Sequence, residues 1–170
     1  MRLYLVQHGP AASKTQDPRS PLTDAGRRAV HKLAAHISQF PLSIDLIEHS
    51  GKLRAQQTAE ILELQLRPTL GCKPVEGLAP ADPVQPVAER LRAELKDVML
   101  VGHLPHLQSL ANTLLGLKAG SDLIRFQMGG CVCLESDDSG KWTVCWMLTP
   151  DLLPEEDEPS HPSGIWTLET

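Results

Sequence analysis

Short apolar runs alternate with longer amphipathic segments along most of the chain. Apolar runs of the length and composition typical of buried strands lie at residues 2–6, 44–47, 73–75 and 98–101. Between and after them, apolar residues recur at helical spacing in a segment that Thr23 caps and that ends before Pro41, and over 53–66, 84–95 and 107–117. This alternation predicts an α/β domain, a three-layer α/β/α sandwich with a mostly parallel central sheet.

The pattern changes in the last third of the chain. Residues 131–135 and 141–148 have the pattern of two strands joined by an acidic turn, which predicts a hairpin. Trp142 and Trp146 alternate with Val144, so we expect both indoles to pack on one face of the sheet. We therefore expect one domain over residues 1–150 and an acidic, proline-rich tail over residues 151–170.

The composition excludes some classes of function. With 170 residues, of which 41% are hydrophobic, the chain is large enough for one real core. Its net charge of −5 argues against a non-specific nucleic-acid binder, because no basic surplus is present to neutralise phosphates. No apolar run is long enough for a membrane helix, and the N-terminus enters a strand without a signal-peptide pattern. We expect a cytoplasmic monomer that contacts neither nucleic acid nor membrane.

Cysteine usage indicates no metal or disulfide framework. The four cysteines, at positions 72, 131, 133 and 145, form no Cys-x-x-Cys pair and lack histidines at zinc-finger spacing. Residues 131 and 133 alternate on a strand, so their side chains share a face as buried free thiols. No acidic cluster is suited to a divalent cation, and we expect no metal and no cofactor.

Three of the predicted strands end beside polar residues that suit phosphate chemistry. His8, Ser50 and His103 follow the first, second and fourth apolar runs. Because ligands of parallel sheets bind beyond the carboxyl ends of the strands, these residues should face one crevice. Arg54 lies near the start of the next helix, where free N–H groups and an arginine fork favour phosphate oxygens. The constellation predicts a phosphoryl-transfer site.

Four segments in this order and spacing resemble a known family. They are Leu5-Val6-Gln7-His8-Gly9, Pro21-Leu22-Thr23-Asp24-Ala25-Gly26, Ser50-Gly51-Lys52-Leu53-Arg54-Ala55-Gln56-Gln57-Thr58 and Val101-Gly102-His103-Leu104-Pro105. The resemblance is to the histidine phosphatase superfamily, the phosphoglycerate-mutase-like group, and covers residue 2 to about residue 150. Within it, the compact length and the Gly-His-Leu-Pro loop are most similar to the phosphohistidine phosphatases of the SixA type.

The resemblance implies covalent catalysis through a phosphohistidine. His8 would attack phosphorus from a neutral ring nitrogen, its other nitrogen donating to a carbonyl such as that of the Gly9 turn. Arg54 and His103 would hold the non-bridging oxygens, and water would hydrolyse the intermediate. Thr58 is expected to serve helix packing. The other substrate-binding positions are expected at Gln7, Gly9, Ser50 and Leu104.

One position departs from the family pattern, because Gln7 stands where the motif has arginine. Glutamine donates an N–H to a phosphate oxygen but brings no charge. Losing one charge-assisted contact costs about 2–3 kcal/mol of transition-state stabilisation, roughly a hundredfold in rate. Either the site is weakened toward a binding role or another cation enters it. Arg19 is the first candidate and Lys14 the second.

The second departure concerns the general acid. Phosphomonoesterases of the superfamily usually place a Glu or Asp near the loop after the third strand, where only Glu76 and Asp82 stand here. Glu76 is the candidate proton donor. An alkoxide leaving group needs a proton far more than an imidazole does, so a weak acid favours an N–P substrate.

These observations predict a phosphatase acting on protein phosphohistidine, with a phosphohistidine-bearing protein as partner. A small-molecule phosphomonoesterase and a non-catalytic phosphate-binding or adaptor module are the alternatives. Mutase activity is least favoured, because it needs a lidded pocket that excludes water. Among the remaining histidines, His106 is expected to be solvated or half-buried. The others are expected on the surface, at His31, His36, His49 and His161.

Overall fold

The computed structural model describes residues 1–153. The elements in chain order are β1 (Arg2–Gln7), α1 (Asp24–Ile37), β2 (Leu46–His49), α2 (Leu53–Leu66), β3 (Cys72–Pro74), α3 (Gln85–Arg92), β4 (Val98–Gly102), α4 (His106–Leu115), β5 (Cys131–Ser136), β6 (Trp142–Leu148) and the 3₁₀ helix η1 (Pro150–Leu152). Every strand and helix that the sequence pattern predicts is present, with ends shifted by a few residues.

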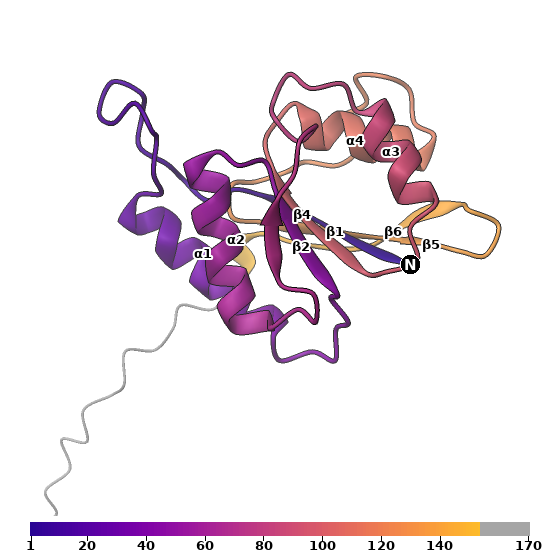
Figure 1. Cartoon of the computed structure of the whole chain (residues 1–170), viewed down its shortest axis with the longest axis horizontal. Helices are drawn as coiled ribbons and strands as arrows, with labels where there is room; N and C mark the ends of the chain where they lie inside the picture. The colour runs from indigo at the N-terminus through magenta and orange to yellow at the C-terminus, as the bar shows by residue number, and fades with distance from the viewer. Residues whose placement is uncertain (154–170) are drawn as a thin grey trace, which may run out of the picture.

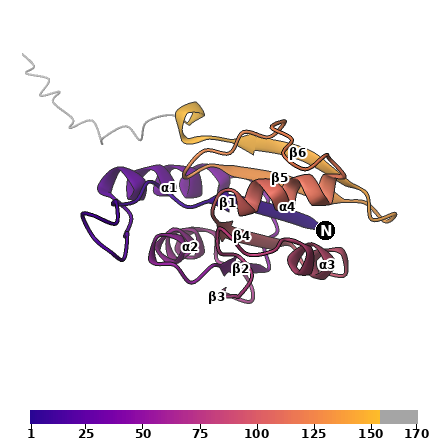
Figure 2. The same cartoon turned by 90° about the horizontal axis from the view of Figure 1, so that it is seen from above.

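The strands form one mixed sheet in the order β3-β2-β4-β1-β5-β6. The four strands from β3 to β1 are parallel, and β5 and β6 extend the sheet antiparallel. Helices α1 and α2 cover one face and α3 and α4 the other, so three layers result (Figures 1 and 2). The predicted α/β/α sandwich with its mostly parallel sheet is confirmed.

Strand β1 explains why the sheet has two cores. Tyr4 and Val6 belong to the core under α1 and α2, whereas Leu3 and Leu5 belong to the core under α3 and α4. All four side chains are fully buried. A strand covered on both faces needs apolar residues at every position, which is why the run reads as continuous instead of alternating.

The helix ends follow local sequence signals. Thr23 caps α1 by accepting a hydrogen bond from the Gly26 N–H. Helix α4 ends at Gly116, whose φ of 69° lies in the left-handed region. Helix α3 is shorter than predicted and ends at Arg92; Leu95, which the pattern assigned to its apolar face, is 92% exposed.

The expectation that Trp142 and Trp146 share one face of the sheet is wrong. Trp142 lies in the α3/α4 core, whereas Trp146 packs on the other face, 6.0 Å from Tyr4 between ring centroids. The cause is a bulge: Cys133 pairs with Trp146 and the next residue, Leu134, pairs with Val144. One extra residue in β6 reverses the side-chain alternation beyond it.

The thiols match their prediction. All four cysteines are free, and Cys131 and Cys133 lie buried on the same face of β5.

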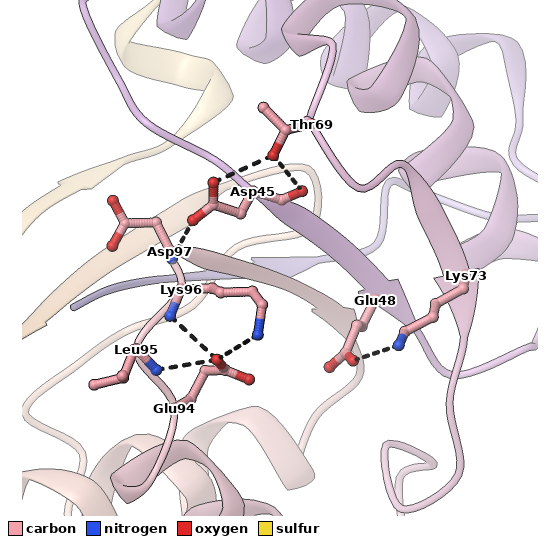
Figure 3. A network of polar contacts seen from close by, with 8 residues as sticks. All are labelled: Asp45, Glu48, Thr69, Lys73, Glu94, Leu95, Lys96 and Asp97. Carbon is pink, nitrogen blue, oxygen red and sulfur yellow. Dashed lines mark hydrogen bonds and ion pairs between the residues drawn. The ribbon is translucent and has the colours of Figure 1, made fainter.

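Polar contacts fix the amino ends of β2 and β4 relative to each other. The Asp97 N–H donates to the Asp45 carboxylate over 2.9 Å, and the Thr69 hydroxyl donates to the same side chain over 3.2 Å (Figure 3). Further along β2, the buried Glu48 forms an ion pair with Lys73 over 3.8 Å and accepts a hydrogen bond from Arg90 over 2.6 Å. These contacts hold the register that aligns the opposite, carboxyl ends of the strands.

The chain continues in packed form past the expected domain boundary. Leu153 is buried against the α1/α2 core after the η1 turn. The remainder of the predicted acidic tail, from residue 154 onward and including His161, lies outside the described residues. Within residues 1–153, no helix is both long and apolar enough to cross a membrane.

Glycine at position 26 is a steric requirement of the fold. A Cβ there would overlap the Pro10 carbonyl oxygen, where the loop after β1 crosses α1. Alanine is ordinarily better than glycine inside a helix by about 1 kcal/mol. Here we expect the opposite: Gly26→Ala should lower the free energy of unfolding by about 2–3 kcal/mol, because the backbone at Pro10 or Gly26 must shift to make room for the Cβ.

Urea unfolding of both proteins measures this effect. Ala25→Ser, an exposed neighbour in the same helical turn, is the control and should change stability by less than about 0.5 kcal/mol. A Gly26→Ala protein as stable as the wild type would show that the loop yields freely.

Candidate active site

His8 follows β1 directly and is held in one orientation. Its ring is 8% exposed, and Nδ1 lies 2.7 Å from the Gly9 carbonyl oxygen. A carbonyl oxygen only accepts, so Nδ1 carries the hydrogen of the neutral ring. The lone pair therefore sits on Nε2, which accepts a 3.0 Å hydrogen bond from Nε of Arg54. This is the tautomer that a nucleophilic imidazole requires.

Arg54 is placed by the first turn of α2, and Thr58 one turn later ties that helix to the β1 loop. The Thr58 hydroxyl donates to the Arg54 carbonyl over 2.8 Å and accepts the Gly9 N–H over 3.1 Å. Thr58 is fully buried. A Cβ on Gly9 would lie 2.9 Å from Gly26 O, so no larger residue fits this turn.

His103 follows β4 and faces His8. The two ring centroids are 4.9 Å apart. Nε2 of His103 shares a 2.6 Å hydrogen bond with the Ser50 hydroxyl, while Nδ1 is buried and has no partner among the described residues. Strands β1, β2 and β4 are adjacent in the sheet, which explains how residues about fifty positions apart meet at one edge.

Burial and neighbouring positive charge favour neutral rings at this site. Burial lowers the pKa of His8 below its ordinary value; the Gly9 hydrogen bond raises it by less, and the charge of Arg54 adds a still smaller lowering effect. Burial, followed by the proximity of His8 and Arg54, lowers the pKa of His103 to about 3. Both imidazoles are therefore uncharged near neutral pH, and Arg54 is the cation in contact with His8.

Gln7 lies at the edge of the site beside a separate hollow. Its side chain is 6% exposed, and Oε1 is buried without a hydrogen-bond partner in the described part of the chain. Together with Leu104, it lines an open hollow of about 600 Å³. Two of the predicted substrate-binding positions thus border the same surface.

Arg19, the cation expected to compensate for Gln7, is engaged elsewhere. Its guanidinium pairs with the Asp17 carboxylate over 3.2 Å, and its side chain is 77% exposed. Lys14 lies exposed in the same loop. Within residues 1–153, no hydrogen bond or ion pair joins either cation to the site histidines.

Glu76 borders a cleft on the other side of Ser50. This cleft has a volume of about 800 Å³ and is also lined by Gly51 and Asp82. The Asp82 carboxylate accepts the Ala79 N–H over 2.8 Å, which stabilises the loop. The structure therefore places both candidate acids on a cleft that Ser50 also lines.

Two histidines differ from their expected positions. His49 is 6% exposed and accepts the Gly51 N–H on Nδ1 over 3.2 Å, so it supports the Ser50 turn instead of lying on the surface. His106 is 1% exposed, although a solvated or half-buried position was predicted. His49 is the last residue of the buried strand β2, and His106 begins α4 four residues after the buried strand β4, so both positions favour burial.

Arg125 is a residue that the sequence analysis missed. It lines the hollow of Gln7 and Leu104 from the connection between α4 and β5. No motif surrounds it, and only the fold brings it to the site. Among residues 1–153, no three His, Cys, Asp or Glu side chains are grouped as metal ligands.

Comparison with known proteins supports the resemblance seen in the sequence. The model of the histidine phosphatase superfamily (branch 1) matches residues 3–82. An uncharacterized protein from Picosynechococcus sp. is 32% identical over 146 residues, which are 80% of this chain and 86% of that protein.

Solved structures share the fold over nearly their whole length. The protein histidine phosphatase SixA in complex with tungstate has 26% identity and a TM-score of 0.78, covering 89% of this chain and 98% of that one. The α-ribazole phosphatase from Shigella flexneri has 18% identity and a TM-score of 0.69, covering 88% and 97%. With its motifs and its fold in agreement, the chain belongs to the histidine phosphatase superfamily.

Proposed function

We propose that this protein hydrolyses phosphohistidine on proteins, with His8 as the covalent nucleophile. The observation that carries the proposal is the state of the His8 ring. Nδ1–H donates to the Gly9 carbonyl, so the lone pair is on Nε2, where it accepts the Arg54 Nε–H and becomes available for attack when Arg54 turns to the phosphoryl oxygens. A neutral imidazole held in one tautomer is an activated nucleophile.

The reaction follows from these contacts. Nε2 attacks phosphorus as the bond between phosphorus and the substrate nitrogen breaks; the bonding pair leaves on that nitrogen, and the departing imidazole takes one proton from solvent. The resulting positive charge on His8 is shared through the hydrogen bond from Nδ1–H to the Gly9 carbonyl. The N–H groups of Arg54 turn from Nε2 to the phosphoryl oxygens, and His103 and Ser50 complete their binding. Water then attacks the phospho-His8 phosphorus, the bond between phosphorus and Nε2 breaks with its electron pair returning to Nε2, inorganic phosphate leaves, and the proton of the attacking water passes to solvent.

The choice of a nitrogen leaving group rests on proton supply. A departing imidazole tolerates weak protonation, whereas a departing alkoxide requires a positioned acid. Within the described residues, no hydrogen bond or ion pair joins Glu76 or Asp82 to the two site histidines. The SixA structure, named a protein histidine phosphatase, is among the similar ones and carries tungstate, an oxyanion of phosphate shape.

A small-molecule phosphomonoesterase is the second candidate, because one observation favours it. Glu76 and Asp82 line the cleft of about 800 Å³ next to Ser50. This volume is large enough for a small metabolite to bind beside one of the two carboxyl groups. In that case either carboxyl group would protonate the leaving oxygen.

A substrate panel separates the two candidates. We would compare kcat/KM for a phosphohistidine peptide, for sugar and nucleotide phosphates, and for the same substrates with Glu76→Gln. The proposal expects the phosphohistidine peptide to be preferred and Glu76→Gln to change its turnover by less than about threefold. Fast turnover of esters with none of phosphohistidine would overturn it.

The pH dependence tests the state of the rings. Since the pKa of His8 lies below its ordinary 6.5, Nε2 is free above that pH and protonated only in more acidic solution. We expect kcat/KM to be level from pH 6.5 to 8 and to fall with acidification, by about tenfold per pH unit below the His8 pKa. With a pKa of about 3, His103 stays neutral throughout.

Rate measurements on a phosphohistidine peptide, corrected for its uncatalysed acid hydrolysis, provide this profile. The ionisation of the phosphoryl group is followed separately by phosphorus NMR. An increase in activity toward low pH would contradict the neutral-nucleophile assignment.

A further inference from the structure

An open hollow adjoins the phosphoryl site. The hollow of about 600 Å³ is lined by Gln7 and Leu104, which are the chain neighbours of His8 and His103. The Gly129 N–H donates to the carbonyl oxygens of Gln7 and His8, over 2.9 and 3.2 Å. These bonds fix the wall of the hollow to the strand that carries the nucleophile, so a group bound there has a defined position relative to phosphorus.

The floor of the hollow contains an unmet hydrogen-bond acceptor. Gln7 is only 6% exposed, and its Oε1 accepts no hydrogen bond from any donor within residues 1–153. Leaving a buried carbonyl oxygen unpaired costs free energy. An N–H donor on a bound ligand, such as a peptide amide or an imidazole, would satisfy it once the buried amide turns toward the hollow.

The wall of the hollow contains an unpaired cation. Arg125 stands between Ile124 and Phe126, which are 6% and 8% exposed and anchor its backbone in the α3/α4 core. Its side chain is exposed, has no ion pair with any described residue, and meets no acidic residue in the lining. A free guanidinium beside a phosphoryl site favours a carboxylate on the substrate.

Apolar side chains extend the surface away from the site. At Met147 the hollow adjoins a second one of about 500 Å³, which Leu123 and Val144 also line. Exposed fractions are 39% for Leu104, 50% for Met128, 39% for Met147, 46% for Val144 and 78% for Leu123. These are half of the large hydrophobic side chains that residues 1–153 expose. A gathering of this kind marks a protein contact, and thioethers adapt to varied partners.

We propose that these residues form a docking strip for the protein segment that bears the phosphohistidine. The strip consists of Leu104, Leu123, Arg125, Met128, Val144 and Met147. It receives a segment with an acidic side chain next to the phosphohistidine, which pairs with Arg125, and with apolar side chains further along. A small phosphorylated metabolite would reach Arg125 but not Val144 or Leu123. The proposal rests on the proposed function and specifies its substrate class.

A charge-swap experiment tests the Arg125 contact. Two phosphohistidine peptides differ only in carrying Glu or Lys beside the phosphorylated residue, and kcat/KM is measured for both. The wild type should prefer the Glu peptide by about fivefold, the value of one exposed ion pair. Arg125→Glu should reverse the preference, whereas the matched control Arg92→Glu, at the exposed last residue of α3, should keep it.

A second variant tests the apolar part of the strip. Extending the Glu peptide by an amphipathic segment should lower its KM in the wild type. Leu123→Asp should raise the KM of the extended peptide by about tenfold, because one leucine contact is lost. Leu95→Asp, at a leucine that is 92% exposed elsewhere, is the control. Circular dichroism melting verifies that each variant is folded.

The outcomes separate the two proposals. An unchanged Glu/Lys preference in Arg125→Glu, or equal losses in Leu123→Asp and Leu95→Asp, overturns the docking strip while the proposed function stands. A wild type that turns over phosphate esters but neither peptide overturns the proposed function, and the docking strip with it.

Discussion

His8→Ala is expected to lower kcat/KM for a phosphohistidine peptide by about four orders of magnitude, the loss typical of removing a covalent nucleophile. The variant keeps Arg54 and His103, so phosphate binding survives at reduced affinity while the phosphoenzyme cannot form. Rapid-quench mass spectrometry at neutral pH should find the wild type phosphorylated on His8 during turnover. The same measurement should find no phosphorylated histidine in the variant.

His31→Ala is the matched control, because His31 is an exposed residue of α1 and lies outside the strand ends and loops that carry the site residues. It should retain wild-type rates and the phospho-His8 intermediate. If His8→Ala keeps activity within tenfold of the wild type, or if the trapped phosphoryl group lies on another residue, the covalent mechanism is excluded. Phosphate binding without turnover in the wild type would favour the adaptor alternative instead.

Much of the architecture could be predicted because burial on both faces leaves a strong sequence signal. The continuous apolar runs 3–6 in β1 and 98–101 in β4 indicate strands covered by two helical layers. Thr23 and Gly116 mark helix ends through backbone chemistry that does not depend on distant contacts. The meeting of His8, Ser50 and His103 followed from the rule that parallel strands align their carboxyl ends.

The remaining features depend on contacts that a local pattern does not contain. A bulge at Cys145 changes the face of Trp142, yet an inserted residue leaves no mark in the periodicity of so short a strand. Arg19 was predicted to supply the charge that Gln7 lacks, but it pairs with Asp17, two residues away. Arg125 reaches the hollow only because its buried neighbours are packed into the α3/α4 core.

Gln7→Arg is expected to raise kcat/KM about a hundredfold, the reverse of losing one charge-assisted contact of about 2–3 kcal/mol. Arginine is the residue that the family motif has at this position. The open hollow beside Gln7 gives room for the longer side chain. A guanidinium there would contact phosphoryl oxygens that the neutral amide stabilises only weakly. Turnover of a phosphohistidine peptide and affinity for inorganic phosphate together measure the effect.

The measured increase in kcat/KM shows which cations contact the phosphoryl group in the wild type. An increase near a hundredfold means that the wild-type site works with Arg54 as its one contacting cation. A change below threefold means that another cation already fills the role, and Arg19→Ala and Arg125→Ala in the same panel identify it. Arg19 must leave Asp17 to reach the substrate, so its removal lowers activity only if that surface pair opens. Arg125 forms no ion pair within residues 1–153, and we expect its removal to lower activity in proportion to the acidity of the peptide beside the phosphohistidine.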